Sequence, residues 1–414
     1  MKKTTNYPPT IFLAVDPGAG NLKIYSSCFE PVKIQSLVHY GNAEDFPSGY
    51  KGLADDALHY KRGSSKHLKQ SENRYWIVGE SVTGRELQCP TPYDRAQLKT
   101  ENALPLLLGG LILKERIEPG ETNIVLVSSH HSPEASGEAL RKELEGWHEI
   151  VCGGLTYQIQ IKMPENGVIQ EGSAVKADGN EYSTLDIGFL TCMLTPRLKS
   201  GQPIPEKTHK TKYGVGELIH RIANSSELKS LPELGGLPGK PSVVVNGIIE
   251  AVERSTEDIL YRDNGECVSI TEIYKSCLKG WIMDVMSEAL RKLNQYQGTD
   301  YRVIAIGGGV NIPFMRSFLQ NKGIEIYAGD PLCANVQSIH ERHLMPLLSG
   351  ELEEEDLELL EFKDFPGSKG KQANAEPPAK AKKPKTRKKP QQQEEEVLAS
   401  VYTREPQLPV LPKS

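Results

Sequence analysis

Two segments of the chain share a pattern that limits the folds open to it. In each, a short run of apolar, β-favouring residues ends in an aspartate, and a glycine follows within two positions. The segments are IFLAVDPGAGNLK (residues 11–23) and STLDIGFLT (residues 183–191). A buried strand that leads into an Asp–Gly turn once in each half predicts a duplicated α/β unit, with the two turns facing each other across a cleft.

The rest of the chain alternates between strand-like and helix-like stretches, which predicts an α/β fold. The runs that we interpret as buried strands are residues 11–15, 124–127, 157–163, 183–187 and 303–306. The stretches that favour helices are residues 96–117, 134–145 and 255–294, the last with an interruption near Asn264 and Gly265.

The composition is that of a globular protein without an overall excess of positive charge. The chain has 414 residues, of which 38% are hydrophobic, and a net charge of -5. Its seven cysteines include no CxxC pair, which favours reduced thiols over a disulfide framework or a zinc site. His130 and His131 lack a third metal ligand in register, so we interpret them as a pair at the end of a loop.

The apolar run at residues 11–15 is too short for a secretory signal, and no stretch approaches about 20 apolar residues. We therefore expect a cytoplasmic protein. We expect a first lobe at 8–180, a second lobe at 181–348 and an acidic, helix-like segment at 349–364. The remainder, 365–414, is rich in Lys, Pro and Gln with a basic cluster at 380–390, and we expect it to be disordered.

The first Asp–Gly segment carries the residue types of a phosphate site. Gly18 and Gly20 let backbone N–H groups approach phosphate oxygens, Lys23 supplies positive charge, and Asp16 suits a hydrated Mg²⁺. Two common motifs are excluded. A dinucleotide fingerprint would need glycine in place of Lys23, and a Walker A loop in GGLPGKPS fails because Leu234 and Pro241 replace required residues.

A third segment, VIAIGGGVNIPFMRSFLQ (residues 303–320), runs from a predicted strand into Gly307, Gly308 and Gly309. Three glycines allow a flat group to lie against bare backbone. A helix expected to begin near Pro313 adds positive potential at its N-terminus.

The order of these three motifs resembles the actin/Hsp70/sugar-kinase superfamily, and within it the ParM (StbA) family of bacterial plasmid-segregation actins. Further similarity lies at residues 74–82, 94–111, 211–219 and 330–339. The resemblance covers about residues 11–340 and implies two RNase H-like lobes around a nucleotide cleft.

The resemblance also implies roles for residues of this chain. Asp16 and Asp186 would organise Mg²⁺ largely through water, and Lys23 would contact the β- or γ-phosphate of ATP, or of GTP. Glu217 would reach the ribose, or else is a surface helix residue. The backbone positions implied for phosphate are Gly18, Gly20, Gly188 and Thr191, and those for adenosine are Gly307, Gly308 and Gly309.

Members of the family place a Glu or Gln after a strand to orient the attacking water, about 20 residues before the second aspartate. That spacing favours Glu165 over its rivals Gln170 and Glu171, with Asp186 as the second catalytic residue. The chain departs from the family where Phe189 and Leu190 replace small residues, and we expect this crowding to slow hydrolysis. Ser338 replaces a glycine in the final motif.

The activity implied is nucleotide-dependent assembly into filaments with ATP hydrolysis, for plasmid or other DNA segregation through an adaptor protein. A cytoskeletal scaffold for cell shape or membrane organisation is the alternative, and a monomeric small-molecule kinase is a third. The basic tail would contact DNA, anionic lipid or the acidic segment of a neighbouring copy, or only add solubility.

Overall fold

The computed structural model describes residues 8–47, 54–85, 87, 89–90, 95, 97–175, 181–231, 241–255, 258–263, 266–296, 302–349, 362 and 365. All of them belong to one unit that extends from Met1 to Phe365, which is distinct from the unit Pro366–Ser414. The predicted acidic segment and the predicted disordered tail therefore lie outside the described residues, apart from Ser349, Phe362 and Phe365.

The first sheet has ten strands in the order β3-β2-β1-β7-β9-β8-β5-β6-β4, with β10 paired to β7. β1, β2 and β3 are antiparallel neighbours, whereas β7 runs parallel to β1. The strands are β1 (Thr10–Pro17), β2 (Asn21–Ser26), β3 (Phe29–Gln35), β4 (Val38–Gly41), β5 (Leu58–Gly63), β6 (Tyr75–Val78), β7 (Gly120–His130), β8 (Gly146–Cys152), β9 (Leu155–Lys162) and β10 (Val168–Gln170).

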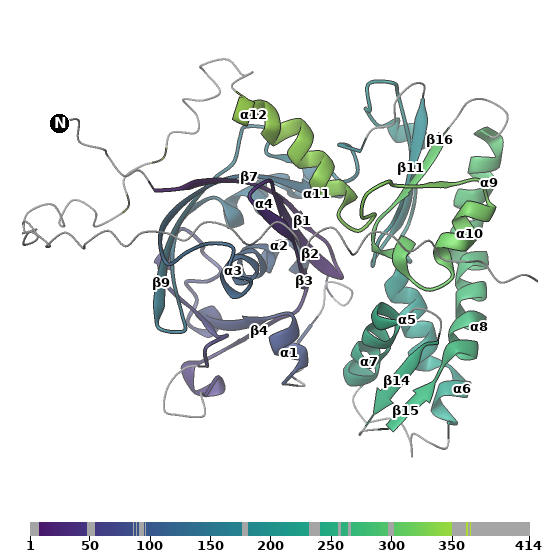
Figure 1. Cartoon of the computed structure of the whole chain (residues 1–414), viewed down its shortest axis with the longest axis horizontal. Coiled ribbons are helices and arrows are strands. Elements are labelled where there is room, and N and C mark those ends of the chain that lie inside the picture. Colours follow the sequence, from purple (N-terminus) through teal and green to yellow (C-terminus); the bar gives the residue numbers. More distant parts are fainter. Residues whose placement is uncertain are drawn as a thin grey trace, which may run out of the picture. The chain divides into compact units, whose positions relative to one another are not determined.

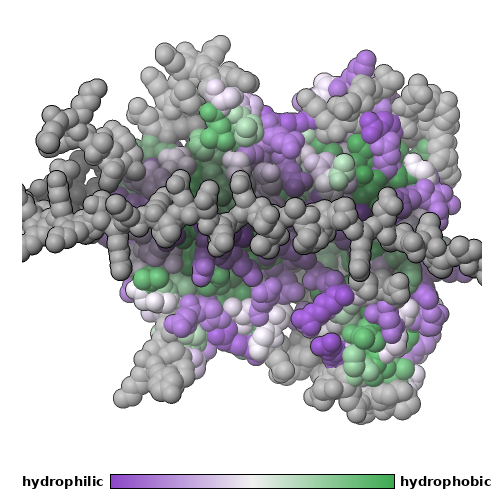
Figure 2. All heavy atoms as spheres, in the orientation of Figure 1, coloured by the Kyte–Doolittle hydropathy of each residue, from purple (hydrophilic) through white to green (hydrophobic). Residues whose placement is uncertain are grey.

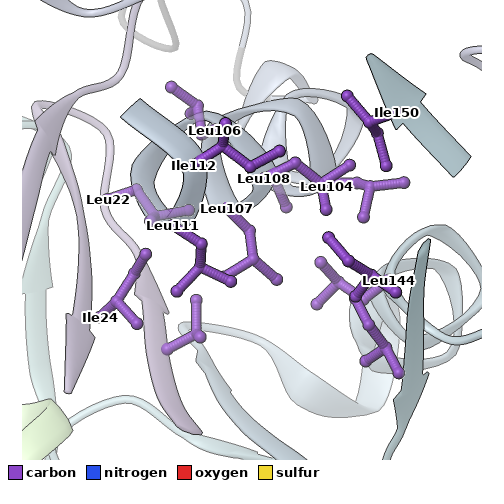
Figure 3. Packing of buried hydrophobic residues seen from close by; sticks show 14 of the residues in the cluster. Leu22, Ile24, Leu104, Leu106, Leu107, Leu108, Leu111, Ile112, Leu144 and Ile150 are labelled. Carbon is purple, nitrogen blue, oxygen red and sulfur yellow. The ribbon is translucent and has the colours of Figure 1, made fainter. Parts of the chain in front are cut away.

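The core of this lobe is organised by the helix α3 (Ala103–Leu113), whose sequence ALPLLLGGLIL is apolar on all sides. Such a helix must be covered all round. Figure 1 shows the sheet curled around it, and Figure 3 shows its leucines packed against strand residues such as Leu22 and Ile24. Gly109 permits the close approach, because a Cβ there would lie 2.5 Å from Val78. The shorter helices are α1 (Glu80–Thr83), α2 (Leu98–Glu101) and α4 (Pro133–Leu144).

The second sheet repeats the arrangement of the first with fewer strands, in the order β13-β12-β11-β16-β17. β11 and β12 form an antiparallel hairpin and β16 runs parallel to β11, as β1, β2 and β7 do in the first sheet. This confirms the predicted duplication. The strands are β11 (Tyr182–Ile187), β12 (Cys192–Arg197), β13 (His209–Thr211), β16 (Arg302–Ile306) and β17 (Glu325–Ile326).

Helices and one hairpin of the second lobe share a core that includes Trp281 and Tyr274. The hairpin, which Figure 1 shows beside α7, consists of β14 (Leu260–Asp263) and β15 (Glu266–Ser269). The helices are α5 (Val215–Asn224), α6 (Ser226–Lys229), α7 (Pro241–Arg254), α8 (Thr271–Trp281), α9 (Ser287–Tyr296) and α10 (Met315–Asn321).

The hairpin corrects the helix that we predicted over residues 255–294. Residues 260–263 and 266–269 are strands, and helix begins only at Thr271. The residues between the strands, Asn264 and Gly265, are a pair that strongly favours a two-residue hairpin connection. We had interpreted this pair as a break within a helix, whereas the residues on both sides of it form strands.

The last described helices belong with the first sheet, although we expected the second lobe to extend to residue 348. α11 (Ala334–Ile339) continues through a π-helical turn into α12 (Met345–Ser349). Val336, Ile339 and Leu344 share one buried cluster with Ala14 of β1 and Val127 of β7. In Figure 1 these green helices lie beside β1 and β7.

On the face that Figure 2 shows, many of the visible described residues are hydrophilic, and hydrophobic residues appear in groups among them. Among the helices built from described residues, none combines the length and the apolar character needed to cross a membrane.

Candidate functional site

The two Asp–Gly turns and the triple glycine line one cavity of about 620 Å³. The first turn connects β1 to β2, the second connects β11 to β12, and the triple glycine follows β16. Each lies at the carboxyl end of a central strand, where open α/β sheets commonly bind ligands. The lining includes Asp16, Gly18, Gly20, Lys23, Asp186, Gly188, Thr191, Gly307, Gly308 and Gly309, so the structure brings together all of these predicted positions.

The first turn carries a buried ion pair. The Lys23 ammonium donates to Asp16 Oδ2 at 2.9 Å, and the Ser129 hydroxyl donates to Asp16 Oδ1 at 3.0 Å. Burial opposes the charge of Asp16, but Lys23, Lys99 and these hydrogen bonds hold its pKa below the usual range. Burial likewise opposes the charge of Lys23, yet chiefly its pairing with Asp16 raises its pKa to about 12. Both groups are therefore charged at neutral pH.

Gly18 is required by the local geometry of this turn. Its N–H donates to Asp16 O at 2.8 Å, and a Cβ at this position would lie 2.4 Å from Asn21 O and 2.7 Å from Lys23 Nζ. A side chain there would displace either the backbone or the lysine. The bare backbone is what lets the ammonium stand beside the turn and face the cavity.

The second turn carries an aspartate without a close cation. None of the described hydrogen bonds or ion pairs involves the Asp186 carboxylate. Burial and the nearby carboxylates of Glu171 and Asp16 raise its pKa to about 7, although Lys23 and Lys99 act in the opposite direction. At neutral pH this group is poised to gain a cation, because a positive charge beside it would restore the ionised form.

The backbone of the second turn is held by the start of α5. Val215 N–H donates to Gly188 O at 3.0 Å, and Gly216 N–H donates to Phe189 O at 2.8 Å. Gly188 N–H donates to Thr191 O at 2.9 Å, which closes the turn itself. The first N–H groups of α5 are thus used within the protein, and the turn presents a fixed edge to the cavity.

Phe189 brings the two turns into contact across the cavity. A Cβ at Gly20 would lie 3.0 Å from both the Cβ and Cγ of Phe189. Phe189 also lines the cavity together with Leu190. The bulky residue that departs from the family pattern therefore packs against the glycine of the opposite turn.

An apolar part of the cavity complements this charged part. It is formed by the second lobe, from α5, α7 and the segments that follow β16. Its lining residues are Val215, Ile219, Ile249, Val252, Ile312 and Leu332. Gly307 has a φ of +90° and its N–H donates to Pro331 O, so this glycine is needed for the turn itself. A cavity with one apolar and one charged part suits a ligand that has a flat ring at one end and phosphates at the other.

The structure does not bring Glu165 to this cavity. Its side chain is exposed, and its carbonyl accepts a hydrogen bond of 2.5 Å from Arg141 Nη2 in the turn after β9. Glu171, which we had ranked below it, lines the cavity. The reason is the short strand β10, which pairs in parallel with the end of β7 and brings Glu171 to the strand end that holds Ser129.

Glu217 also lies outside the cavity lining. It forms an ion pair with Arg221 at 3.0 Å on the surface of α5, which agrees with the alternative that it is a surface helix residue. His131 does line the cavity, and its ring lies against that of His130 in a tilted arrangement, with 4.4 Å between the ring centroids. Burial and the nearby Lys99 lower the pKa of His131 to about 3, so it is neutral. Within the described ranges, no cluster of three or more His, Cys, Asp or Glu residues is placed to hold a metal.

The sequence interpretation missed several residues of the cavity. Lys99 from α2 and Lys210 from β13 add positive charge near Glu171. Asn335 of α11 donates to Ser129 Oγ at 2.8 Å and accepts from Gly172 N–H at 3.0 Å, which ties the Glu171–Gly172 turn to the partner of Asp16. Lys99 and Asn335 lay in segments whose resemblance to the family was noted, but neither residue was singled out there, and Lys210 lay just outside such a segment.

Together, the duplicated sheets and the cavity between their hairpin turns define an actin-like ATPase fold. Three solved structures show the same fold across most of this chain. ParM of Bacillus thuringiensis with ATP is 17% identical with a TM-score of 0.57, covering 82% of this chain and 99% of that one. The actin-like protein Alp7A is 14% identical with a TM-score of 0.56, covering 83% and 100%.

The third structure is Ta0583, an archaeal actin homolog, which is 15% identical with a TM-score of 0.57 and covers 81% of this chain and 99% of that one. At the level of sequence, neither a family model nor a curated protein matches the chain. The likeness therefore establishes a ParM-like actin fold.

Proposed function

We propose that this protein is a nucleotide-dependent, filament-forming ATPase of the actin type. One observation carries the proposal: two Asp–Gly turns from duplicated hairpins meet at a single cavity, one with a lysine ion pair and the other beside Glu171. The apolar part of the same cavity accommodates a nucleoside. ParM of Bacillus thuringiensis was solved with ATP, AMPPNP and ADP, which supports nucleotide as the ligand of this cavity too.

The phosphates lie between the turns in this proposal. Lys23 contacts the β- or γ-phosphate, and the backbone of Gly18, Gly20, Gly188 and Thr191 surrounds the phosphate oxygens. Gly307, Gly308 and Gly309 lie against the adenosine. We assign no described polar group of the cavity to the edge of the base. GTP is therefore a second candidate ligand.

Mg²⁺ fits the residues present. The carboxylates of Asp16 and Asp186 both line the cavity, and the pKa of Asp186 is raised to about 7 by burial and by the charges of Glu171 and Asp16. Hard oxygen ligands with surplus negative charge are what this cation requires. Bound there through water, Mg²⁺ would neutralise phosphate charge.

Hydrolysis is assigned to Glu171 in place of Glu165. The Glu171 carboxylate orients a water whose oxygen bonds to the γ-phosphorus as the bond from that phosphorus to the β-phosphate oxygen breaks. One proton of the water passes to Glu171 and from there to solvent. Positioning dominates this chemistry, so a carboxylate fixed at the cavity wall is better suited than an exposed one on a turn.

The proposal also includes assembly into filaments and the cargo that the filaments would move. Nucleotide that bridges the two turns favours one relative arrangement of the lobes, and loss of the γ-phosphate removes that preference. Head-to-tail contacts between copies are heterologous and so give open polymers. We infer a role in plasmid or DNA segregation through an adaptor, with a cytoskeletal scaffold as the alternative.

Sedimentation tests this proposal. The wild-type protein is centrifuged with ATP and Mg²⁺, with ADP and Mg²⁺, and without nucleotide, alongside Asp186→Ala. We expect pelleting of the wild type only with ATP and no pelleting of Asp186→Ala. A protein that stays in the supernatant while its ATPase is stimulated by a small hydroxyl compound would instead be a kinase.

A further inference from the structure

Lys99 is the buried cation of the cavity that the proposed reaction leaves unused. It lies on α2, and only 6% of its side chain is exposed. Its Nζ donates to Glu171 Oε2 at 3.1 Å, with 17% of the Glu171 side chain exposed. A lysine is seldom buried to this degree unless it is paired. The burial of Lys99 therefore depends on its pairing with Glu171.

The elements around Lys99 fix it in place. α2 contacts both α3 and α4 of the first lobe, so the lysine extends from a packed helix. Its partner is fixed as well. Glu171 N–H donates to His130 O at 3.0 Å, and the following Gly172 N–H donates to Asn335 Oδ1 at 3.0 Å. Two anchored backbones thus hold the ammonium and the carboxylate together at the cavity wall.

The pair has a direct consequence for a carboxylate that must orient water. A free glutamate side chain samples several rotamers, whereas one that gives an oxygen to a fixed ammonium keeps a single orientation. Only Oε2 is engaged with Lys99, so Oε1 remains available to a water.

We propose that Lys99 is a positioning residue for hydrolysis, which acts by holding the Glu171 carboxylate in the orientation that aims it at the attacking water. This rests on the proposed ATPase function and assigns a residue that neither motif spacing nor the resemblance identified. Lys99 acts through Glu171. Removing it therefore slows turnover without weakening nucleotide binding.

A double-mutant cycle tests the inference, with the steady-state kcat for ATP and the Kd for ADP measured in the full-length chain. The variants are Lys99→Met, Glu171→Gln and the two combined. We expect Lys99→Met to lower kcat about tenfold and Glu171→Gln about 100-fold, within the range usual for loss of acid–base and positioning groups. The combined variant should match Glu171→Gln alone, because Lys99 has no carboxylate left to position.

Two further variants separate positioning from general effects of charge or folding. Lys99→Arg keeps the positive charge and should restore most of the lost kcat. Lys142→Met removes a surface lysine from its pair with Glu138 on α4, where 73% of the lysine is exposed, and should leave kcat unchanged. In every variant the Kd for ADP should stay within about twofold of the wild type, which also shows that the chain has folded.

The outcomes distinguish this inference from the function on which it rests. Additive losses of about 1,000-fold in the combined variant, or an unchanged kcat in Lys99→Met, overturn the role of Lys99 and leave the ATPase intact. A tenfold weaker Kd with normal kcat makes Lys99 a phosphate ligand and also overturns it. A wild-type chain that binds nucleotide but does not hydrolyse it overturns both proposals.

Discussion

The two Asp–Gly turns of this protein share a topology but differ in charge. In the first, Asp16 is paired with Lys23 and accepts a hydrogen bond from Ser129. In the second, Asp186 has no such partner among the described residues, and burial together with the nearby Glu171 raises its pKa to about 7. The Asp16 carboxylate is thus already paired with a cation, whereas Asp186 forms no ion pair among the described residues.

The difference shows how a duplicated unit can acquire two tasks. Both hairpins place an aspartate at the end of a central strand, so backbone geometry alone would make the turns equivalent. Lys23 lies on β2, directly opposite Asp16 in the strand register. Its counterpart in the second hairpin, opposite Asp186, is Met193. The lysine at this position in the first hairpin and the methionine in the second explain why Asp16 is paired with a cation and Asp186 is not.

The largest expected effect is a difference in stability between variants of the two aspartates. Asp16→Asn leaves the buried Lys23 without its charge partner, which should cost about 3 kcal/mol or more. Asp186→Asn removes a carboxylate whose ionised form is disfavoured by its neighbours, so stability at pH 8 should be unchanged or higher. Thermal unfolding without nucleotide or Mg²⁺ measures both. We expect Tm to fall by at least about 6 °C for Asp16→Asn alone.

Equal losses of stability in the two aspartate variants would break the comparison. Lys23→Met combined with Asp16→Asn provides the control, because removing both charges avoids the unpaired ammonium. That double variant should be more stable than Asp16→Asn alone.

The next effect concerns the carboxylate between the turns. Glu171→Gln should reduce the ATPase kcat about 100-fold, because an amide orients water but accepts a proton poorly. Glu165→Gln is the matched control, since its side chain is exposed outside the cavity, and its kcat should stay within twofold. A reversal of these two results would return the catalytic role to Glu165.

A smaller effect is expected from the residue through which the turns touch. Phe189 lies against Gly20 across the cavity, so Phe189→Ala should relieve crowding near the phosphates and raise kcat about threefold. The loss of a partly buried ring should lower Tm by about 2–4 °C. Phe189→Leu, which keeps most of the bulk, serves as the control. If Phe189→Ala hydrolyses more slowly than wild type, the ring helps to shape the site.

The smallest effect comes from a second buried carboxylate with a raised pKa, which serves as a comparison for Asp186. Glu143, outside the cavity, also has a pKa of about 7, raised mainly by burial and only slightly by Glu101. Its folded-state pKa exceeds the unfolded value, so its contribution to stability is full below about pH 4.5 and is lost as pH rises through 7.

Glu143→Gln should therefore raise Tm by about 2 °C at pH 8 and by less at pH 5. Nucleotide with Mg²⁺ should not alter this difference, since Glu143 lies away from the proposed ligand. A difference that nucleotide abolishes would show that Glu143 is coupled to the cavity.

Strong local patterns predicted the fold and the two turns well. Each Asp–Gly turn follows a short run of β-favouring residues, and β1, β7, β9, β11 and β16 all appear where such runs predicted strands. The error over residues 260–269 arose because short strands of a hairpin carry too few residues to outweigh flanking helical periodicity.

The carboxylate that we propose for hydrolysis differs from the one that spacing favoured, for a related reason. β10 has three residues and is placed by contacts with β7 and α4, which lie far from it in the chain. Spacing alone therefore favoured Glu165 after β9, where the longer strand ends. No motif assigned a role to Lys99 or Lys210, and only the folded chain brings them near Glu171.

The central claim is that nucleotide in this cavity drives self-assembly, and light scattering of the purified wild-type protein after addition of ATP tests it most directly. We predict a rise in scattering that requires Mg²⁺, decays as ATP is consumed, and persists in Glu171→Gln. Scattering that stays flat while ATP is bound, at protein concentrations well above those in the cell, would contradict it.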